Sequence, residues 1–311
     1  MWQDASQQPK RQRGERARSA PSPELLVLVL DPRLLDLSEV TSNSPLFPEL
    51  WGSLQLFLRA FGALALDRKA VLLAASSAGP VRLSEEQSGG CSWETAFRNA
   101  IALPREGEPQ MAAAISSALC LAQRRKAEAS EMKLQARILV IEAAGSQVDY
   151  QGQSSALVNV AFAAKAASVL VDGLALGPCT SFLLRQVCIL AQGKHLALPS
   201  KRVDSKGQSI PLPEVLAPSL LFHFLASADV RKELLVAPDY EHLPAVCRCH
   251  GTPQDVGYVC SCCLAIYCSD ALAICQVCGT RFKRDREVNC SIKDLDPDAF
   301  RLLTAAQRAP A

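Results

Sequence analysis

The sequence predicts a doubly wound, mostly parallel α/β sheet followed by a small zinc-binding domain. Three observations support this expectation. Apolar runs alternate with segments of helical spacing along most of the chain. Apolar residues make up 49% of the 311 residues, which is enough to bury one sizeable core and a smaller unit. Cysteines then crowd together near the C-terminus, where long apolar runs are few.

Continuous apolar runs mark the strands, because a strand covered on both faces shows no alternation of apolar and polar residues. The first run begins at Glu24 and ends at Asp31, with only Leu and Val between them. The expected strands cover residues 24–31, 69–75, 137–142, 168–175 and 195–198. The last is short and follows Gly193.

Apolar residues at intervals of three and four predict a helix after most of these strands. In the first helix, Leu50, Leu54, Phe57 and Phe61 follow this spacing. The expected helices cover residues 49–66, 111–129, 154–167, 181–191 and 213–226. Residues 84–107 are instead expected to form an irregular insertion, because they contain two adjacent glycines, a proline and mixed charge. About five strand–helix alternations favour a parallel sheet with helices on both faces.

Composition divides the chain into four parts. Residues 1–22 form a basic, polar tail that is too polar to pack, and both a nuclear-import signal and a solvated tail are open interpretations. The α/β domain is expected over 23–237, the cysteine-rich domain over 238–290 and a C-terminal tail over 291–311. No signal peptide or membrane span is expected, because no apolar stretch has the required length.

The large domain lacks the motifs of common enzymes. No phosphate-binding or dinucleotide-binding glycine pattern and no nucleophile elbow occurs, so we expect no catalysis and no small-molecule substrate. A formal net charge of +2 does not indicate a general nucleic-acid binder. Asp31, at the end of the first strand, is the one residue placed to hold Mg²⁺, but we expect it to accept bonds from backbone N–H groups instead.

Most of the 13 cysteines lie in one cluster. Four others, Cys91, Cys120, Cys179 and Cys188, stand in apolar surroundings and are expected to be small buried side chains. Eight lie between Cys247 and Cys278, and Cys290 follows. In a chain expected to be intracellular, such clustering favours metal binding over disulfides.

Two Cys-x-x-Cys turns predict one zinc site. Each turn directs two thiolates to one point, and zinc takes four such ligands. The expected ligands are Cys260, Cys263, Cys275 and Cys278. Cys262 leaves the register ambiguous, and the usual spacing favours Cys263.

A second set of candidate zinc ligands consists of Cys247, Cys249, His250 and Cys268. Ligand pairs of cross-braced zinc modules interleave along the chain, and these residues flank the first Cys-x-x-Cys turn in that way. Cys268 shows no evident partner, so one or two zinc ions are both open. The alternative is that Cys268 packs in a small core while Cys247 and Cys249 are free thiols. Either arrangement is closed, which is typical of structural zinc.

The cysteine-rich segment resembles a known family. Residues 257–268, with the second Cys-x-x-Cys turn and Phe282, resemble the C-terminal zinc finger of the thirty-four-kilodalton subunit of general transcription factor IIH (TFIIH). Residues 137–144, 159–164 and 193–199 are also similar to that family. The resemblance implies a von Willebrand factor A-like domain followed by a cysteine finger. The metal-adhesion pattern Asp-x-Ser-x-Ser of that fold is absent here, because Asp31 is followed by Pro-Arg-Leu-Leu.

The resemblance implies a non-catalytic nuclear subunit of the TFIIH core, bound chiefly to the forty-four-kilodalton subunit. It implies support for RNA polymerase II initiation and nucleotide excision repair, with no membrane and no direct sequence-specific nucleic-acid contact. Two alternatives remain at this point. Interleaved ligands also occur in RING-type ubiquitin ligases, and a basic group follows the second turn, as in a nucleic-acid binder. That group consists of Arg281, Lys283, Arg284 and Arg286.

Overall fold

The computed structural model describes fourteen segments, residues 23–34, 46–65, 67–85, 93–103, 107–129, 133–143, 150–177, 182–198, 202–203, 209–210, 212–233, 245–250, 253–254 and 256–282. The chain divides into two compact units, Met1–Asp239 and Tyr240–Ala311, and each is described by itself. The expected tails, 1–22 and 291–311, lie outside the described residues.

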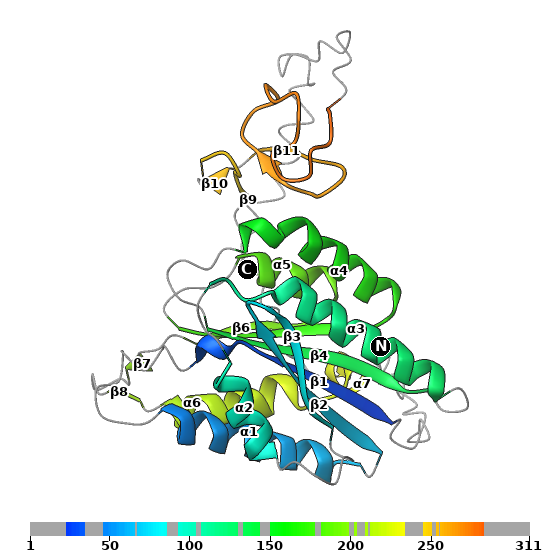
Figure 1. Cartoon of the computed structure of the whole chain (residues 1–311), viewed down its shortest axis with the longest axis vertical. Coiled ribbons are helices and arrows are strands. Elements are labelled where there is room, and N and C mark those ends of the chain that lie inside the picture. Colours follow the sequence, from blue (N-terminus) through cyan, green and yellow to red (C-terminus); the bar gives the residue numbers. More distant parts are fainter. Residues whose placement is uncertain are drawn as a thin grey trace, which may run out of the picture. The chain divides into compact units, whose positions relative to one another are not determined.

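A six-stranded sheet forms the centre of the larger unit (Figure 1). Its strands are β1 (Glu24–Leu30), β2 (Arg68–Ser76), β3 (Gly79–Glu85), β4 (Gln135–Ala143), β5 (Leu170–Leu176) and β6 (His195–Leu198). They lie in the order β3-β2-β1-β4-β5-β6, and every pairing is parallel except that of β2 with β3. The order reverses between β1 and β4, so the predicted doubly wound, mostly parallel sheet is confirmed.

Helices cover both faces of this sheet (Figure 1). One layer holds α3 (Met111–Glu128), α4 (Ser154–Ala166) and α5 (Phe182–Leu190), and the other holds α1 (Leu46–Ala63), α2 (Trp93–Ile101) and α6 (Leu212–Ser219). Successive residues of β1 pack into opposite layers: Val27 joins the α3–α5 core, and Leu28 joins the α1–α6 core. This explains why the strand is apolar at every position.

The structure corrects the expected irregular insertion at residues 84–107. The strand β3 pairs antiparallel with β2 at the sheet edge, and α2 follows it. Pro80 and the polar residues of β3 hide a strand pattern, but an edge strand tolerates both. Ala96, Phe97 and Ala100 of α2 are fully buried in the core between the sheet and the α1–α2–α6 layer.

The expected single helix over 213–226 is also corrected. The α-helix α6 contains Pro218 and passes into a π-helical turn, Leu220–Phe224, before a short helix α7 (Ala228–Glu233). Proline has no backbone N–H to donate and interrupts the helix ladder, and the π-helical turn begins two residues after Pro218. A small two-stranded sheet, β7 (Arg202–Val203) with β8 (Ser209–Ile210), precedes α6.

Arg137 joins the end of this helical segment to the sheet. Its guanidinium is buried, 2.7 Å from Glu24 on β1, and Glu24 lies 2.9 Å from Arg68 on β2. Arg137 also donates to the backbone carbonyls of residues 224, 225 and 226. These carbonyls lie at the end of the helical segment, where backbone donors run out. The Arg231 side chain also donates to those of Phe224 and Ala226. Arg137 therefore bonds to both a carboxylate and a helix terminus.

Asp31 lies at the carboxyl end of β1, beside the point where the strand order reverses. Its carboxylate accepts bonds from the backbone N–H groups of Arg33 (2.9 Å) and Ala143 (3.2 Å). The Arg33 guanidinium adds two bonds, of 3.1 and 2.7 Å. The expected bonds to backbone N–H groups are confirmed, and a cationic side chain already occupies this carboxylate.

The smaller unit has very short strands. Strands β9 (Ala245–Val246) and β10 (Pro253–Gln254) pair antiparallel, as do β11 (Tyr258–Val259) and β12 (Ile266–Tyr267). Among the residues of this unit that the structure describes, the buried cluster consists of Ala265, Tyr267 and three cysteines. So little apolar burial is insufficient for a unit of this size to fold without a cross-link or a metal.

We predict that Arg137→Ala lowers the free energy of unfolding by about 3–5 kcal/mol, because it removes one partner of a buried ion pair. Urea denaturation of the full chain measures this. Arg98→Ala is the matched control, since Arg98 forms an exposed pair with Glu94 one helical turn away. Equal destabilisation by the two substitutions would contradict a special role for the buried pair.

We predict that Mg²⁺ leaves the melting temperature of the protein unchanged. The Asp31 carboxylate already accepts four hydrogen bonds. Mg²⁺ requires an octahedral shell of oxygen ligands, and the donors around Asp31 occupy the positions that the ion and its waters would need. Thermal melts of wild type and Asp31→Asn, with and without Mg²⁺, test this. A rise with Mg²⁺ in the wild type but not in the variant would show that Asp31 holds the ion.

Candidate metal centres in the C-terminal unit

Two turns of the same geometry position the first cluster. In each turn the N–H of the fifth residue donates to the carbonyl of the leading cysteine: Leu264 to Cys260 (2.8 Å) and Gly279 to Cys275 (2.9 Å). Both fifth residues have positive φ, 59° and 71° respectively. Glycine adopts this conformation freely, whereas leucine does so at a cost. The repeated geometry explains how two Cys-x-x-Cys sequences direct their sulfurs to one point.

The four sulfurs of this cluster have the spacing of a tetrahedral zinc site. Cys260 Sγ lies 3.7 Å from Cys278 Sγ, and Cys263 Sγ lies 3.6 Å from Cys275 Sγ. All four sulfurs lie within 4.8 Å of one another. Zn–S bonds of about 2.3 Å in a tetrahedron place sulfurs about 3.8 Å apart. The four residues therefore fit a zinc ion, and the exposed Cys262 lies outside the group.

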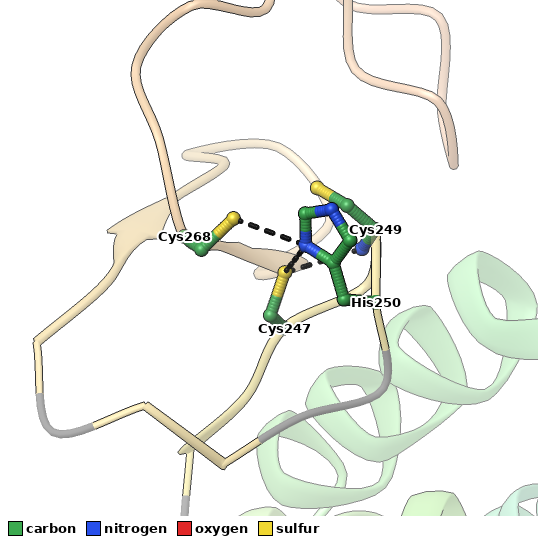
Figure 2. Close-up of side chains that lie close together, drawn as sticks. All are labelled: Cys247, Cys249, His250 and Cys268. Carbon is green, nitrogen blue, oxygen red and sulfur yellow. Dashed lines mark hydrogen bonds between the residues drawn. The ribbon is translucent and has the colours of Figure 1, made fainter.

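The second cluster brings one separate cysteine to a three-ligand loop (Figure 2). Nδ1 of His250 lies 3.7 Å from Cys247 Sγ and 3.4 Å from Cys268 Sγ. Together with Cys249 Sγ, these atoms lie within 4.8 Å of one another. A tetrahedral zinc ion with nitrogen and sulfur ligands requires N···S separations of about 3.6 Å. This cluster also fits a zinc ion.

The two clusters interleave along the chain. Three members of the second cluster come first, the leading turn of the first cluster follows, and Cys268 then returns to the second cluster before Cys275 and Cys278. Cys268, which has no evident partner cysteine in the sequence, thus joins the three side chains of the loop 247–250. Sequence spacing did not reveal it, because the loop contributes three ligand atoms and the return segment contributes one.

Each cluster contains a thiol that ionises easily. The hydroxyl and backbone of Thr280 lower the pKa of Cys278 to about 6. Burial alone raises the pKa of Cys247, but hydrogen bonds from His250 and Cys249 outweigh it and lower that pKa to about 6. Hydrogen bonding with Cys247 raises the pKa of Cys268 to about 11. A bound cation would also deprotonate a thiol of raised pKa such as that of Cys268, because a thiol that coordinates a metal loses its proton.

The cysteines outside the two clusters differ in how far they are buried. Cys188 is fully buried, as expected, but Cys120 on α3 is exposed, so its expected burial is wrong. Its sequence neighbours Leu119 and Leu121 are buried, but Cys120 itself points away from the core. Cys91, Cys179 and Cys290 lie outside the described residues. Within the described segments, no third group of metal-binding side chains occurs, and no helix is long and apolar enough to cross a membrane.

Comparison with known proteins identifies relatives. The chain is 34% identical over 174 residues to General transcription factor IIH subunit 3 of Dictyostelium discoideum, covering 55% of this chain and 41% of that protein. It is 30% identical over 176 residues to General transcription and DNA repair factor IIH subunit TFB4 of Arabidopsis thaliana, covering 57% and 53%. The chain thus spans about half the length of the curated relatives it matches.

A crystal structure of the TFIIH p34 N-terminal domain superposes with a TM-score of 0.47 at 21% identity, covering 65% of this chain and 98% of that one. The family model for transcription factor Tfb4 matches residues 92–279, which is more than half of the chain. This match includes α2 to β6 of the sheet domain and both cysteine clusters. The chain therefore belongs to the transcription factor Tfb4 family, that of the thirty-four-kilodalton TFIIH subunit.

Proposed function

We propose that this chain is a non-catalytic, zinc-stabilised subunit of the TFIIH core. In this role it supports RNA polymerase II initiation and nucleotide excision repair in the nucleus through protein–protein contacts. The observation that carries the proposal is the Tfb4 family match over residues 92–279. The names of the relatives, one a general transcription factor IIH subunit and one a general transcription and DNA repair factor IIH subunit, support these processes.

We propose two structural zinc ions. Cys260, Cys263, Cys275 and Cys278 hold one, and Cys247, Cys249, His250 and Cys268 hold the other. The supporting evidence is the spacing of the ligand atoms and the small apolar core of this unit. Four protein ligands leave no position open for substrate, so the ions contribute to folding and do not catalyse a reaction. We also propose that residues 23–237 and 238–290 are the two domains.

The large domain supplies the partner surface in this proposal. Large apolar side chains stand exposed on its helices, including Phe162 on α4, Ile189 on α5 and Phe222, which is 79% exposed. We propose the forty-four-kilodalton TFIIH subunit as the chief partner. A permanent contact of this kind buries at least about 2,000 Å² and contains more apolar area than ordinary surface.

One alternative function has a specific observation in its favour. The interleaved clusters resemble the ligand order of RING-type ubiquitin ligases. An autoubiquitination assay with a conjugating enzyme decides between a ligase and a structural subunit. For the nucleic-acid alternative, only Arg281 of its four basic residues lies within the described segments, where it is exposed. Salt-dependent DNA binding by the purified chain would favour that alternative.

We predict about two equivalents of zinc per chain, since each cluster of four ligands fits one ion. Cys275→Ser should remove at least about one equivalent and unfold the small unit, because zinc-binding energy in such modules is folding energy. Cys262→Ser is the matched control, since this exposed thiol lies outside both clusters. Elemental analysis measures the content. Undiminished zinc in the Cys275 variant would refute the assignment.

We predict that the chain expressed alone self-associates, because an unpaired contact surface of this size is prone to aggregation. Co-expression with the forty-four-kilodalton subunit should restore a soluble complex, measured by pull-down and size-exclusion chromatography. An unrelated soluble protein serves as the co-expression control. A stable, monodisperse monomer that fails to bind that subunit would overturn the proposed partner.

A further inference from the structure

Tyr267 is the largest side chain in the core of the small unit. Its side chain is 1% exposed, and its ring packs edge-on against Phe282 with centroids 6.2 Å apart. The hydroxyl lies 3.0 Å from Cys275 Sγ and accepts a bond of 3.0 Å from the N–H of Gln276. When Cys275 is a metal-bound thiolate it has no proton, so the tyrosine hydroxyl must be the donor in this contact.

The strand β12 that carries Tyr267 also reaches the other cluster. The next residue, Cys268, supplies the sulfur that completes the second cluster. The carbonyl of Ile266 accepts a bond of 2.8 Å from the N–H of Arg248, which lies between Cys247 and Cys249. A two-residue strand therefore contacts the second cluster through its backbone and its neighbour, and the first cluster through one hydroxyl.

We propose that Tyr267 is a positioning residue that couples the two metal centres. Its hydroxyl donates to the Cys275 thiolate of one centre, while its backbone places Cys268 in the other. This inference rests on the proposed binding of zinc at both clusters. Tyr267 thus orients ligands without belonging to either set of four.

The charge of the first cluster explains the need for such a donor. A divalent ion neutralises only half of the charge of four thiolates, whereas a histidine in the second cluster reduces the charge there. Hydrogen bonds to ionised groups are stronger than neutral ones and disperse this excess charge. Thr280 provides a second hydroxyl, 3.0 Å from Cys278 Sγ. As thiolates, the two cysteines of this turn, Cys275 and Cys278, thus each accept a hydrogen bond from a hydroxyl group.

Tyr267→Phe tests the proposal, and Tyr258→Phe is its matched control. The two tyrosines face each other across the β11–β12 pair, but Tyr258 is 53% exposed. Full-length protein is loaded with Co²⁺, whose thiolate charge-transfer absorption reports electron donation by sulfur, and separately with zinc for release to a chelator. We expect Tyr267→Phe to shift the charge-transfer band and to weaken zinc retention by roughly 10–100-fold, as loss of a ligand-orienting partner typically does. Tyr258→Phe should change neither.

A double-mutant cycle measures the coupling itself. Cys268→Ser removes a ligand of the second cluster, and the affinity of the first cluster is then measured with Tyr267 intact and in the Tyr267→Phe background. We expect the loss caused by Cys268→Ser to be several-fold smaller in the Tyr267→Phe background. An equal loss in both backgrounds overturns the coupling. An unshifted band in a fully loaded Tyr267→Phe protein overturns the hydrogen-bond role.

Further measurements separate failure of this inference from failure of the proposed zinc sites. Wild-type protein without zinc contradicts the sites themselves, whatever the Tyr267 variant does. Wild type with two equivalents and a Tyr267 variant identical to the Tyr258 control contradicts only the inference. Should Tyr267→Phe fail to load metal, Thr280→Val removes the corresponding hydroxyl from Cys278 at a half-buried position. A shifted charge-transfer band in that variant supports the dispersal of thiolate charge by hydroxyl donors, and an unshifted band overturns it.

Discussion

Convergence of four ligands on one point is the constraint on which the C-terminal unit depends. Its buried cluster consists of three cysteines, Ala265 and Tyr267, with a few half-buried neighbours. Such a core cannot offset the conformational entropy lost when the segment orders. The short strands, the two matching turns and the position of Tyr267 follow from the need to bring sulfurs together. In the proposed zinc-bound state, metal ligation replaces the apolar packing that stabilises the larger unit.

The larger unit is stabilised in the opposite way. Two apolar layers enclose the sheet, and several buried charges of the described segments form ion pairs: Glu24 with Arg68 and Arg137, and Asp172 with Arg231. At the strand ends, where open α/β sheets commonly bind ligands, Arg33 is bonded to Asp31. A domain whose Asp31 carboxylate is occupied by Arg33 fits the proposed role as a packing subunit.

Much of this architecture could be predicted from the sequence, because buried parallel strands such as β1 have no polar interruptions. The strand β3 and helix α2 were missed because an edge strand carries polar residues and a proline, and because α2 is short. The Cys-x-x-Cys spacing indicated the first cluster, and the structure places Cys263, not Cys262, within it. The completion of the second cluster required coordinates, since Cys268 joins three ligands eighteen or more residues earlier in the chain. Tyr267 gave no sequence signal, because its role depends on the direction of one hydroxyl.

The interleaved order of the ligands has a consequence for synthesis of the chain. The loop with Cys247, Cys249 and His250 leaves the ribosome first, but its fourth ligand is Cys268. Cys260 and Cys263 emerge before that ligand does and offer two sulfurs of the same kind. An ion captured early by a mixture of these two sets must exchange ligands before both proposed sites are complete. If zinc binds as proposed, the second cluster can be completed once Cys268 has emerged, whereas the first must wait for Cys278.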